Sequence, residues 1–226
     1  MKNLTTVTTL TLVSTSLLLA TAASALAEPS DAAPRGVPAP SNALELTLGT
    51  TYSRGTGDLG DGLPSVEDVA GPGNGMKASI GWRATPNFLI GGYVGVTGFG
   101  DSNSWSKNAA AASAGFKADW HFQPAASFDP WVSVGTGVKV LQIDMTENTR
   151  TLTLTGLELA SVELGVDYRI TPRFAIGPVI GASATMFDHK YYDKMTDEAV
   201  ALDDKKVNWT FTLGLLGRFD VFGTTR

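Results

Sequence analysis

The chain contains no cysteine. This absence excludes a lipid attached to a processed N-terminal cysteine, a disulfide framework and a metal site built on thiolates. Long apolar runs are also missing, since no segment offers the roughly 18 consecutive apolar residues that a membrane-spanning helix needs. The composition is mildly acidic, with a formal net charge of −5, and it provides no basic stripe of the kind that binds nucleic acid.

The N-terminal segment has the pattern of an export signal. Lys2 is followed by an apolar-leaning run and then by the A-x-A pattern of residues 25–27, so residues 1–27 are predicted to be a signal peptide that is removed. Residues 28–42 are rich in proline, alanine and serine, which predicts a flexible leader. The expected organisation is completed by one domain at 43–222 and a short tail at 223–226. Nothing in the sequence predicts a cofactor or a metal site.

Eight later stretches alternate apolar residues with polar residues or glycine. This period of two favours strands and excludes amphipathic helices. The stretches are 43–53, 76–83, 88–99, 110–122, 131–142, 152–170, 174–187 and 207–221. Short or proline-marked connections at 84–87, 123–130 and 171–173 alternate with longer, more polar ones at 58–75, 100–108, 144–150 and 188–206.

This rhythm predicts an all-β protein, an eight-stranded antiparallel up-and-down transmembrane β-barrel. An even number of strands returns both chain ends to the same side of the barrel. Bacterial outer-membrane barrels place their short turns in the periplasm and their longer loops outside. The bacterial outer membrane, with both termini periplasmic, is therefore the expected location.

Alternation alone does not say which face points outward, because a soluble barrel with an apolar interior has the same period. Aromatic residues separate the two cases, since they gather beside both sets of connections. The predicted girdles contain Trp82, Trp120, Phe122, Trp131, Tyr168 and Phe219 near the short turns, and Tyr52 and Trp209 near the long loops. Two aromatic belts are typical of the two membrane–water interfaces. The apolar face is therefore expected to touch lipid.

The opposite face carries charges and glycines, and an eight-stranded barrel has an interior just wide enough for side chains to fill. We therefore expect a plug of ion pairs, because an unpaired buried charge costs several kcal/mol. The predicted plug contains Glu163, Lys117, Lys139, Asp167, Arg169 and Arg218. Glu163 is expected to meet Lys117 and Lys139 near mid-height, with the others toward the short turns. Replacing Glu163 by glutamine is then expected to raise conductance.

The stretch 152–170 does not keep one phase. Leu152 and Leu154 share the predicted lipid-facing phase with later apolar residues, whereas Leu157 and Leu159 have the opposite phase. Glu158 would then face lipid. A β-bulge near 156–160, or a strand that already projects above the bilayer there, would remove this conflict.

The turn phrases ATPNF at 84–88 and ITPRF at 170–174, together with the aromatic final strand, resemble the small eight-stranded outer-membrane barrels of Gram-negative bacteria, the OmpA-like, OmpX-like and opacity-type group. The resemblance covers 43–222. It implies a monomer in contact with outer-membrane lipid and lipopolysaccharide, inserted by the barrel-assembly machinery. That machinery reads a terminal aromatic residue in this group, whereas four residues follow Phe222 here.

Three functions are compatible with such a barrel. The favoured interpretation is a plugged scaffold that displays extracellular loops for structural or surface-interaction roles, and the first alternative is a pore for ions or small solutes. The second alternative is a lipid A-modifying enzyme, which needs a nucleophile, a base and an orienting group at the outer leaflet. His121 lies beside a short turn, and neither it nor His189 has the H-x-S pairing that we associate with lipid A deacylases. We therefore predict no enzymatic activity.

Overall fold

The structure is a computed structural model that describes residues 36–60, 62–100, 106–145, 151–192 and 200–224. These residues belong to one compact unit. The predicted signal peptide (1–27), the first part of the predicted leader (28–35) and the last two tail residues (225–226) lie outside the described residues. Within the described part of the chain, no helix has the length and apolarity needed to cross a membrane.

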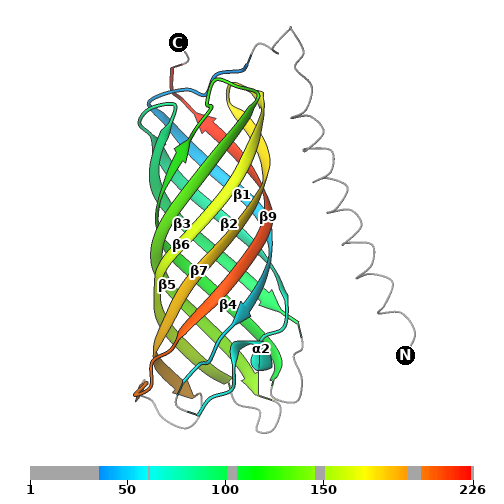
Figure 1. Cartoon of the computed structure of the whole chain (residues 1–226), viewed down its shortest axis with the longest axis vertical. Coiled ribbons are helices and arrows are strands. Elements are labelled where there is room, and N and C mark those ends of the chain that lie inside the picture. Colours follow the sequence, from blue (N-terminus) through cyan, green and yellow to red (C-terminus); the bar gives the residue numbers. More distant parts are fainter. Residues whose placement is uncertain (1–35, 61, 101–105, 146–150, 193–199, 225–226) are drawn as a thin grey trace, which may run out of the picture. The chain divides into compact units, whose positions relative to one another are not determined.

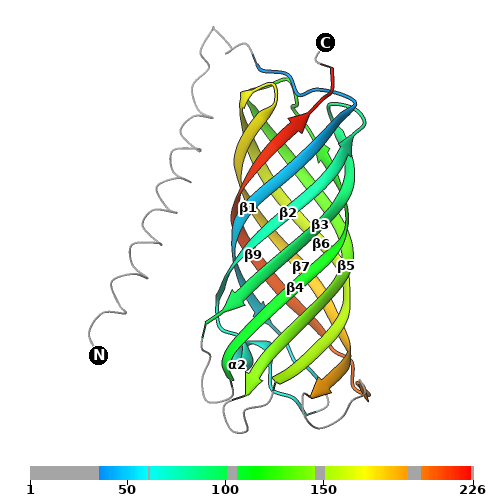
Figure 2. The same cartoon turned by 180° about the vertical axis from the view of Figure 1, so that it is seen from behind.

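Eight long antiparallel strands form a closed barrel (Figures 1 and 2). They are β1 (Ala43–Thr56), β2 (Gly73–Arg83), β3 (Phe88–Phe99), β4 (Ser106–His121), β5 (Phe128–Met145), β6 (Thr151–Thr171), β7 (Phe174–Tyr192) and β9 (Val207–Val221). Sequence neighbours pair with one another, and pairing of β1 with β9 closes the barrel. The two-residue strand β8 (Val200–Ala201) pairs with β7. The predicted eight-stranded antiparallel barrel is confirmed.

The two ends of the barrel differ in their connections. We call the end that carries the β2–β3, β4–β5 and β6–β7 connections the short-turn end, and the opposite end the long-loop end. In the β2–β3 turn, Thr85 and Phe88 exchange backbone hydrogen bonds of 3.3 and 3.4 Å around Pro86 and Asn87. The β6–β7 connection is shorter still, since only residues 172–173 lie between the two strands. The short helix α2 (Val66–Val69) lies at the long-loop end, in the β1–β2 connection (Figure 1).

The described part of the leader, residues 36–42, crosses the short-turn end, and we call it the terminal strap (Figure 1). The backbone N–H of Ala39 donates to the carbonyl of Pro124 at 2.7 Å. Ser41 exchanges two backbone hydrogen bonds of 3.0 Å with Thr224. A Cβ on Gly36 would lie 1.7 Å from the carbonyl oxygen of Ala125, so this close approach requires glycine. The strap therefore lies against the barrel instead of extending away from it.

The outer wall of the barrel is apolar. Seven of the eight residues predicted for the girdles are exposed on it, namely Trp82, Trp120, Phe122, Tyr168, Phe219, Tyr52 and Trp209. Cross-strand ring pairs lie at the short-turn end, including Phe128 with Tyr168 at 5.1 Å between centroids and Phe174 with Phe219 at 4.7 Å. An apolar exterior edged by aromatic rings is the surface of a transmembrane barrel.

Strand β6 changes phase along its length. Its register shifts against β7 between Glu158 and Ala160, so the predicted β-bulge is confirmed. Leu157 and Leu159 face outward, and Glu158 is 5% exposed inside the barrel. The prediction that Leu152 and Leu154 face lipid is wrong, since they are 1% and 0% exposed. The extra residue of a bulge reverses the alternation beyond it.

Candidate functional site

The interior of the barrel is filled in three layers along its length. The ionic layer occupies the short-turn end and contains Glu45, Arg83, Lys117, Asp119, His121, Asp129, Trp131, Asp167, Arg169, Arg218 and Asp220. A polar chamber follows at mid-height. The apolar layer closes the long-loop end and contains Leu59, Val66, Val69, Ala70, Phe99, Ala109, Ala111, Leu141, Ile143, Leu152, Leu154, Phe187 and Leu202.

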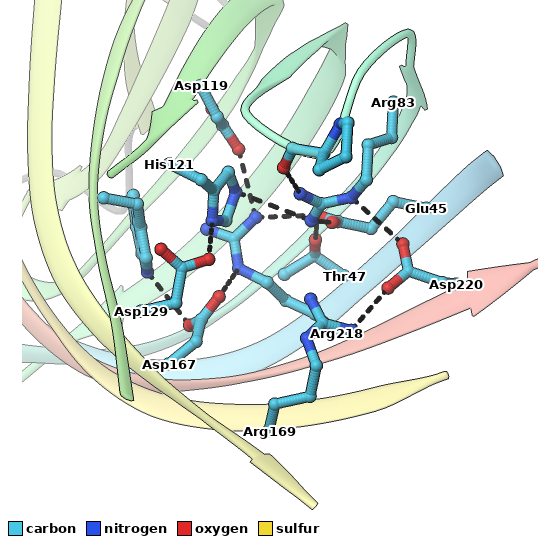
Figure 3. A network of polar contacts seen from close by, with 12 residues as sticks. Glu45, Thr47, Arg83, Asp119, His121, Asp129, Asp167, Arg169, Arg218 and Asp220 are labelled. Atoms are coloured by element: carbon cyan, nitrogen blue, oxygen red, sulfur yellow. Dashed lines mark hydrogen bonds and ion pairs between the residues drawn. The ribbon is translucent and has the colours of Figure 1, made fainter. Parts of the chain in front are cut away.

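Arg218 of β9 is the centre of the ionic layer (Figure 3). Its Nη1 lies 2.7 Å from Glu45 Oε1 on β1 and 3.1 Å from Asp119 Oδ2 on β4. Its Nε lies 3.0 Å from Asp167 Oδ2 on β6. All four side chains are fully buried or nearly so. One guanidinium therefore links four strands across the barrel, which suits the multiple donors of arginine.

Two more arginines connect the ionic layer to the turns (Figure 3). Arg83 pairs with Glu45 and with Asp220, whose Oδ1 lies 3.2 Å from Arg83 Nε. Arg169 Nη1 lies 2.8 Å from the other oxygen of Asp220. The two guanidinium groups also donate to the carbonyls of Pro86 and Pro172 at 3.0 and 3.2 Å. The layer therefore fixes the β2–β3 and β6–β7 turns as well as the strands.

The β4 side of the ionic layer holds a lysine and a histidine. Lys117 Nζ lies 2.8 Å from Asp119 Oδ2 on the same strand. His121 Nδ1 lies 2.7 Å from Asp129 Oδ2, and Asp129 Oδ1 accepts the backbone N–H of Gln123 at 3.0 Å. Four members of the predicted plug, Lys117, Asp167, Arg169 and Arg218, are thus brought together in this layer.

The polar chamber contains three polar contacts made by residues of β2, β3 and β5, and Lys77 Nζ also lies 4.8 Å from the centre of the Tyr93 ring. Lys77 pairs with Glu163 at 2.5 Å, and the hydroxyl of Tyr93 donates to Glu158 at 2.6 Å. Lys139 donates to the hydroxyl of Thr210 at 2.7 Å. These groups line a cavity of about 90 Å³, which is large enough for several water molecules.

The predicted partners of Glu163 are wrong. It pairs with Lys77 instead of Lys117 and Lys139. Lys117 is held by Asp119, which lies two residues away on the same face of β4, and Lys139 reaches Thr210. The alternation of a strand gives the face of each lysine, but it does not give the height that a four-carbon side chain reaches.

The placement of Trp131 in a girdle is also wrong, since its side chain is 2% exposed and lies in the ionic layer. Its indole N–H donates to Asp167 Oδ1 at 2.9 Å, and Arg218 lies over its ring at 4.2 Å. A Cβ on Gly165, which pairs with Trp131 on β6, would lie 2.4 Å from the indole. The glycine therefore makes room for the ring. The alternation of the strand indicates this inward position. Val134 faces outward on the same strand, and residues of opposite parity, such as Trp131, face inward.

Replacing Trp131 by phenylalanine is expected to lower the free energy of unfolding by about 1 to 3 kcal/mol, because Asp167 Oδ1 loses its donor inside the barrel. Trp82→Phe is the matched control, since Trp82 is exposed on the outer wall. Urea unfolding in lipid vesicles, followed by far-UV circular dichroism, measures both. Equal losses for the two variants would contradict the interior role of Trp131.

The apolar layer was not predicted from sequence. Leu59, Val66 and Val69 of the β1–β2 connection fold into the mouth of the barrel and join buried strand residues such as Phe187. The hydroxyl of Ser106 at the start of β4 donates to the carbonyl of Val69 at 2.7 Å. In the sequence this connection is one of the longer, more polar ones. Its apolar residues instead close the long-loop end.

Glu67 holds the β1–β2 connection to the rim. Its Oε1 accepts the hydroxyl of Thr56 at 2.6 Å and its Oε2 accepts the backbone N–H of Gly57 at 2.9 Å. The Thr56 hydrogen bond is the main cause that lowers the pKa of the Glu67 carboxyl. A lowered folded-state pKa means that the ionised group stabilises the loop above its unfolded pKa of about 4.3, and that this contribution is lost as the pH falls through the folded value.

Glu67→Gln is therefore expected to raise amide hydrogen exchange in the described residues of 56–72 at pH 7, by less than about tenfold, since the carboxylate is exposed. The wild-type protein and the variant are expected to converge in protection factor as the pH falls below 4. Asp58→Asn, which changes an exposed carboxylate in the same connection, is the control. A difference that persists unchanged to pH 3 would contradict this role of the ionised carboxylate.

The two histidines lie in different environments. His121 is buried between Asp129 and Arg83, whereas His189 is half exposed and pairs with Asp188 at 3.0 Å. Among the described residues, no group of three or more histidine, aspartate or glutamate side chains is placed to hold a metal ion.

No family model matches the sequence, and no curated protein matches it. Solved structures match the barrel. The crystal structure of Neisserial surface protein A superposes with a TM-score of 0.53 at 16% identity, covering 79% of this chain and 97% of that one. The fold is that of the small outer-membrane barrels. The predicted resemblance to this group is therefore confirmed at the level of fold.

Two further outer-membrane barrels are similar at lower scores. The N-terminal β-barrel domain of Pseudomonas aeruginosa OprF gives a TM-score of 0.44 at 16% identity, covering 80% of this chain and 99% of that one. The attachment invasion locus protein Ail of Yersinia pestis gives 0.46 at 15% identity, covering 79% and 99%.

Proposed function

We propose that the protein is an outer-membrane barrel with a closed interior, and that it holds its long loops at the cell surface for structural or interaction roles. The observation that supports this function is the double closure of the barrel. Arg218 joins three carboxylates across the short-turn end, and a cluster of buried apolar side chains fills the long-loop end. Solutes would have to disrupt both layers to pass.

The proposed orientation places the short-turn end in the periplasm and the long-loop end outside, as in other bacterial outer-membrane barrels. The protein is proposed to be a monomer that contacts outer-membrane lipid and lipopolysaccharide and is inserted by the barrel-assembly machinery. The exposed residue Phe222 follows the last strand, and Thr224 pairs with the terminal strap. The aromatic residue is thus accessible although it is not the last residue.

Planar-bilayer recording of the purified protein tests the closed interior. The wild-type barrel is expected to show rare, small openings and no steady conductance. The pairing of Glu163 with Lys77 changes the result expected from sequence for Glu163→Gln. The variant is now expected to remain closed, because this pair lies in the chamber and both closing layers stay intact. A barrel in which residues 59–69 are replaced by a glycine–serine linker is the comparison, since it loses the loop part of the apolar layer. Steady stepwise conductance of the wild-type protein would overturn the proposal.

The polar chamber favours a second candidate, a narrow path for water or ions. Lys77, Glu163 and Lys139 line a cavity between the two closing layers, and a rearrangement of the ionic layer would connect it to one side. The same recordings separate the candidates, because a pore conducts continuously without any substitution.

Surface display is tested with single cysteines, which the cysteine-free chain allows. Lys205→Cys places a thiol on the exposed β8–β9 connection, and Arg173→Cys places one on the exposed β6–β7 turn. A membrane-impermeant maleimide is expected to label the first in intact cells and the second after permeabilisation of the outer membrane. The reverse order would overturn the proposed orientation.

A further inference from the structure

The outer wall has an open groove of about 650 Å³ near the long-loop end, spanning β2 to β5. Two adjacent cross-strand rows of outward residues form it. We call the row nearer the long-loop end the upper row; it contains Asn74, Gly98, Ala110 and Gln142. The neighbouring row, nearer the short-turn end, is the lower row; it contains Met76, Val96, Ala112 and Val140. The groove is hollow because glycine and alanine stand where other parts of the wall carry large side chains.

An aromatic residue borders the groove on its β1 side. The upper row continues onto β1 as Tyr52, which pairs with Asn74 and is exposed on the wall. On the β2 to β5 side the same row carries small or amide side chains. The groove therefore opens sideways toward lipid and is continuous with the apolar wall that contacts it.

The height of the groove matches the edge of the hydrocarbon core. Gly98 lies ten residues along β3 from Phe88, which pairs with Trp120 in the aromatic belt of the short-turn end. At about 3.3 Å per residue and a strand tilt near 40°, this separation corresponds to about 25 Å along the barrel axis. The apolar band of such barrels is about 25 Å tall. Cross-strand rows run at right angles to the tilted strands, so both rows are oblique to the membrane plane. Gln142, fourteen residues along β5 from Phe128, lies near the headgroups, whereas Asn74, eight residues along β2 from Trp82, faces acyl chains together with the lower row.

A second copy of the chain does not fit this surface. Two copies side by side in a membrane are related by a two-fold axis along the bilayer normal, which keeps every residue at its own height. Two hollows would then face each other and leave a void. The most exposed large side chain of this wall, Phe116 on β4 with 76% exposure, lies six residues along β4 from Ala110 toward the short-turn end and cannot enter the groove of a symmetric partner.

We propose that the groove binds an acyl chain of a membrane lipid in the leaflet at the long-loop end. The chain lies across the lower row, over Val96 and Ala112, and the polar part of the lipid receives a hydrogen bond from the amide of Gln142. A flexible hydrocarbon chain fills a groove of this size without an imposed shape. In the proposed orientation this leaflet is the outer one, and only that assignment of the leaflet rests on the proposed function.

Photo-crosslinking tests the site. The protein is reconstituted in phosphatidylcholine vesicles that contain a small fraction of phosphatidylcholine with a diazirine in one acyl chain, and crosslinked peptides are mapped by mass spectrometry. Crosslinks are expected to be at least fivefold enriched on the peptides of the groove over those of the β7–β9 wall. The readout does not depend on conductance or on orientation, so it separates this proposal from the closed-scaffold function.

Filling the groove provides the decisive variant. A Cβ on Gly98 would have no atom within 4 Å, so Gly98→Leu combined with Ala110→Leu occupies the groove without disturbing the interior. This double variant is expected to reduce the enrichment at least fivefold, whereas Ala182→Leu, on the outer wall of β7, leaves it unchanged. Even labelling around the wild-type wall would overturn the proposal, as would crosslinks between copies of the chain at the groove or an unchanged pattern in the filled variant.

Discussion

Replacing Arg218 by alanine is expected to lower the free energy of unfolding by about 3 to 5 kcal/mol or more, because removing one partner of a buried ion pair leaves the other charge uncompensated. Three carboxylates, those of Glu45, Asp119 and Asp167, lose a cation at once. The loss also removes the group that lies over the Trp131 ring. Urea unfolding in lipid vesicles gives the free energy, and gel migration of the unheated sample reports whether the barrel still folds.

Two further variants make this result specific. Arg173→Ala removes the same charge from the exposed β6–β7 turn and is expected to change the stability by less than about 0.5 kcal/mol. Arg218→Lys keeps the charge but loses the planar fork of donors, so it should fall between the wild-type protein and the alanine variant. If Arg218→Ala were as stable as Arg173→Ala, the ionic layer would not be a stabilising closure of the barrel.

Replacing Leu154 by alanine is expected to cost about 2 to 5 kcal/mol, because the change leaves a cavity in a packed apolar layer. Leu154 is 0% exposed inside the barrel, whereas Leu164 on the same strand is 50% exposed on the outer wall. Leu164→Ala also loses transfer free energy, but lipid chains refill the space and no cavity remains. Its loss is therefore expected to be smaller than that of Leu154→Ala under the same urea titration.

This pair of leucines is a direct test of the bulge in β6. If β6 kept one phase throughout, Leu154 and Leu164 would both face lipid, and their alanine variants would lose similar free energies. A larger loss at Leu164 than at Leu154 would contradict the apolar layer at the long-loop end.

The elements with a regular period were predictable from sequence. The predicted stretch 88–99 coincides with β3, and 207–221 coincides with β9. In this protein, side-chain alternation and turn residues are local properties, so they can be read without knowing the partner strand. The same reasoning placed Lys117, Asp167 and Arg218 on the interior face.

Features that depend on contacts distant in sequence were not predictable in the same way. The partner of Glu163 depends on how far Lys77, on β2, extends across the barrel. The apolar layer needs Val66 and Val69 to fold back over the strands, and an acidic loop sequence does not reveal this. Trp131 differs, because the alternation of its own strand placed it inside. Its proximity to the turn resembles that of a girdle residue, but its parity on β5 decides its position.

The contact between Glu45 on the first strand and Arg218 on the last, 173 residues apart, bears on the order of assembly. Until these two edges meet, Arg218 cannot reach Glu45, and Asp119 and Asp167 come from strands in the middle of the chain. A sheet that has formed most of its hydrogen bonds but has not closed thus carries uncompensated charge on its future inner face. Such an intermediate is disfavoured relative to the finished cylinder, so the last step of folding is coupled to neutralisation of the lumen.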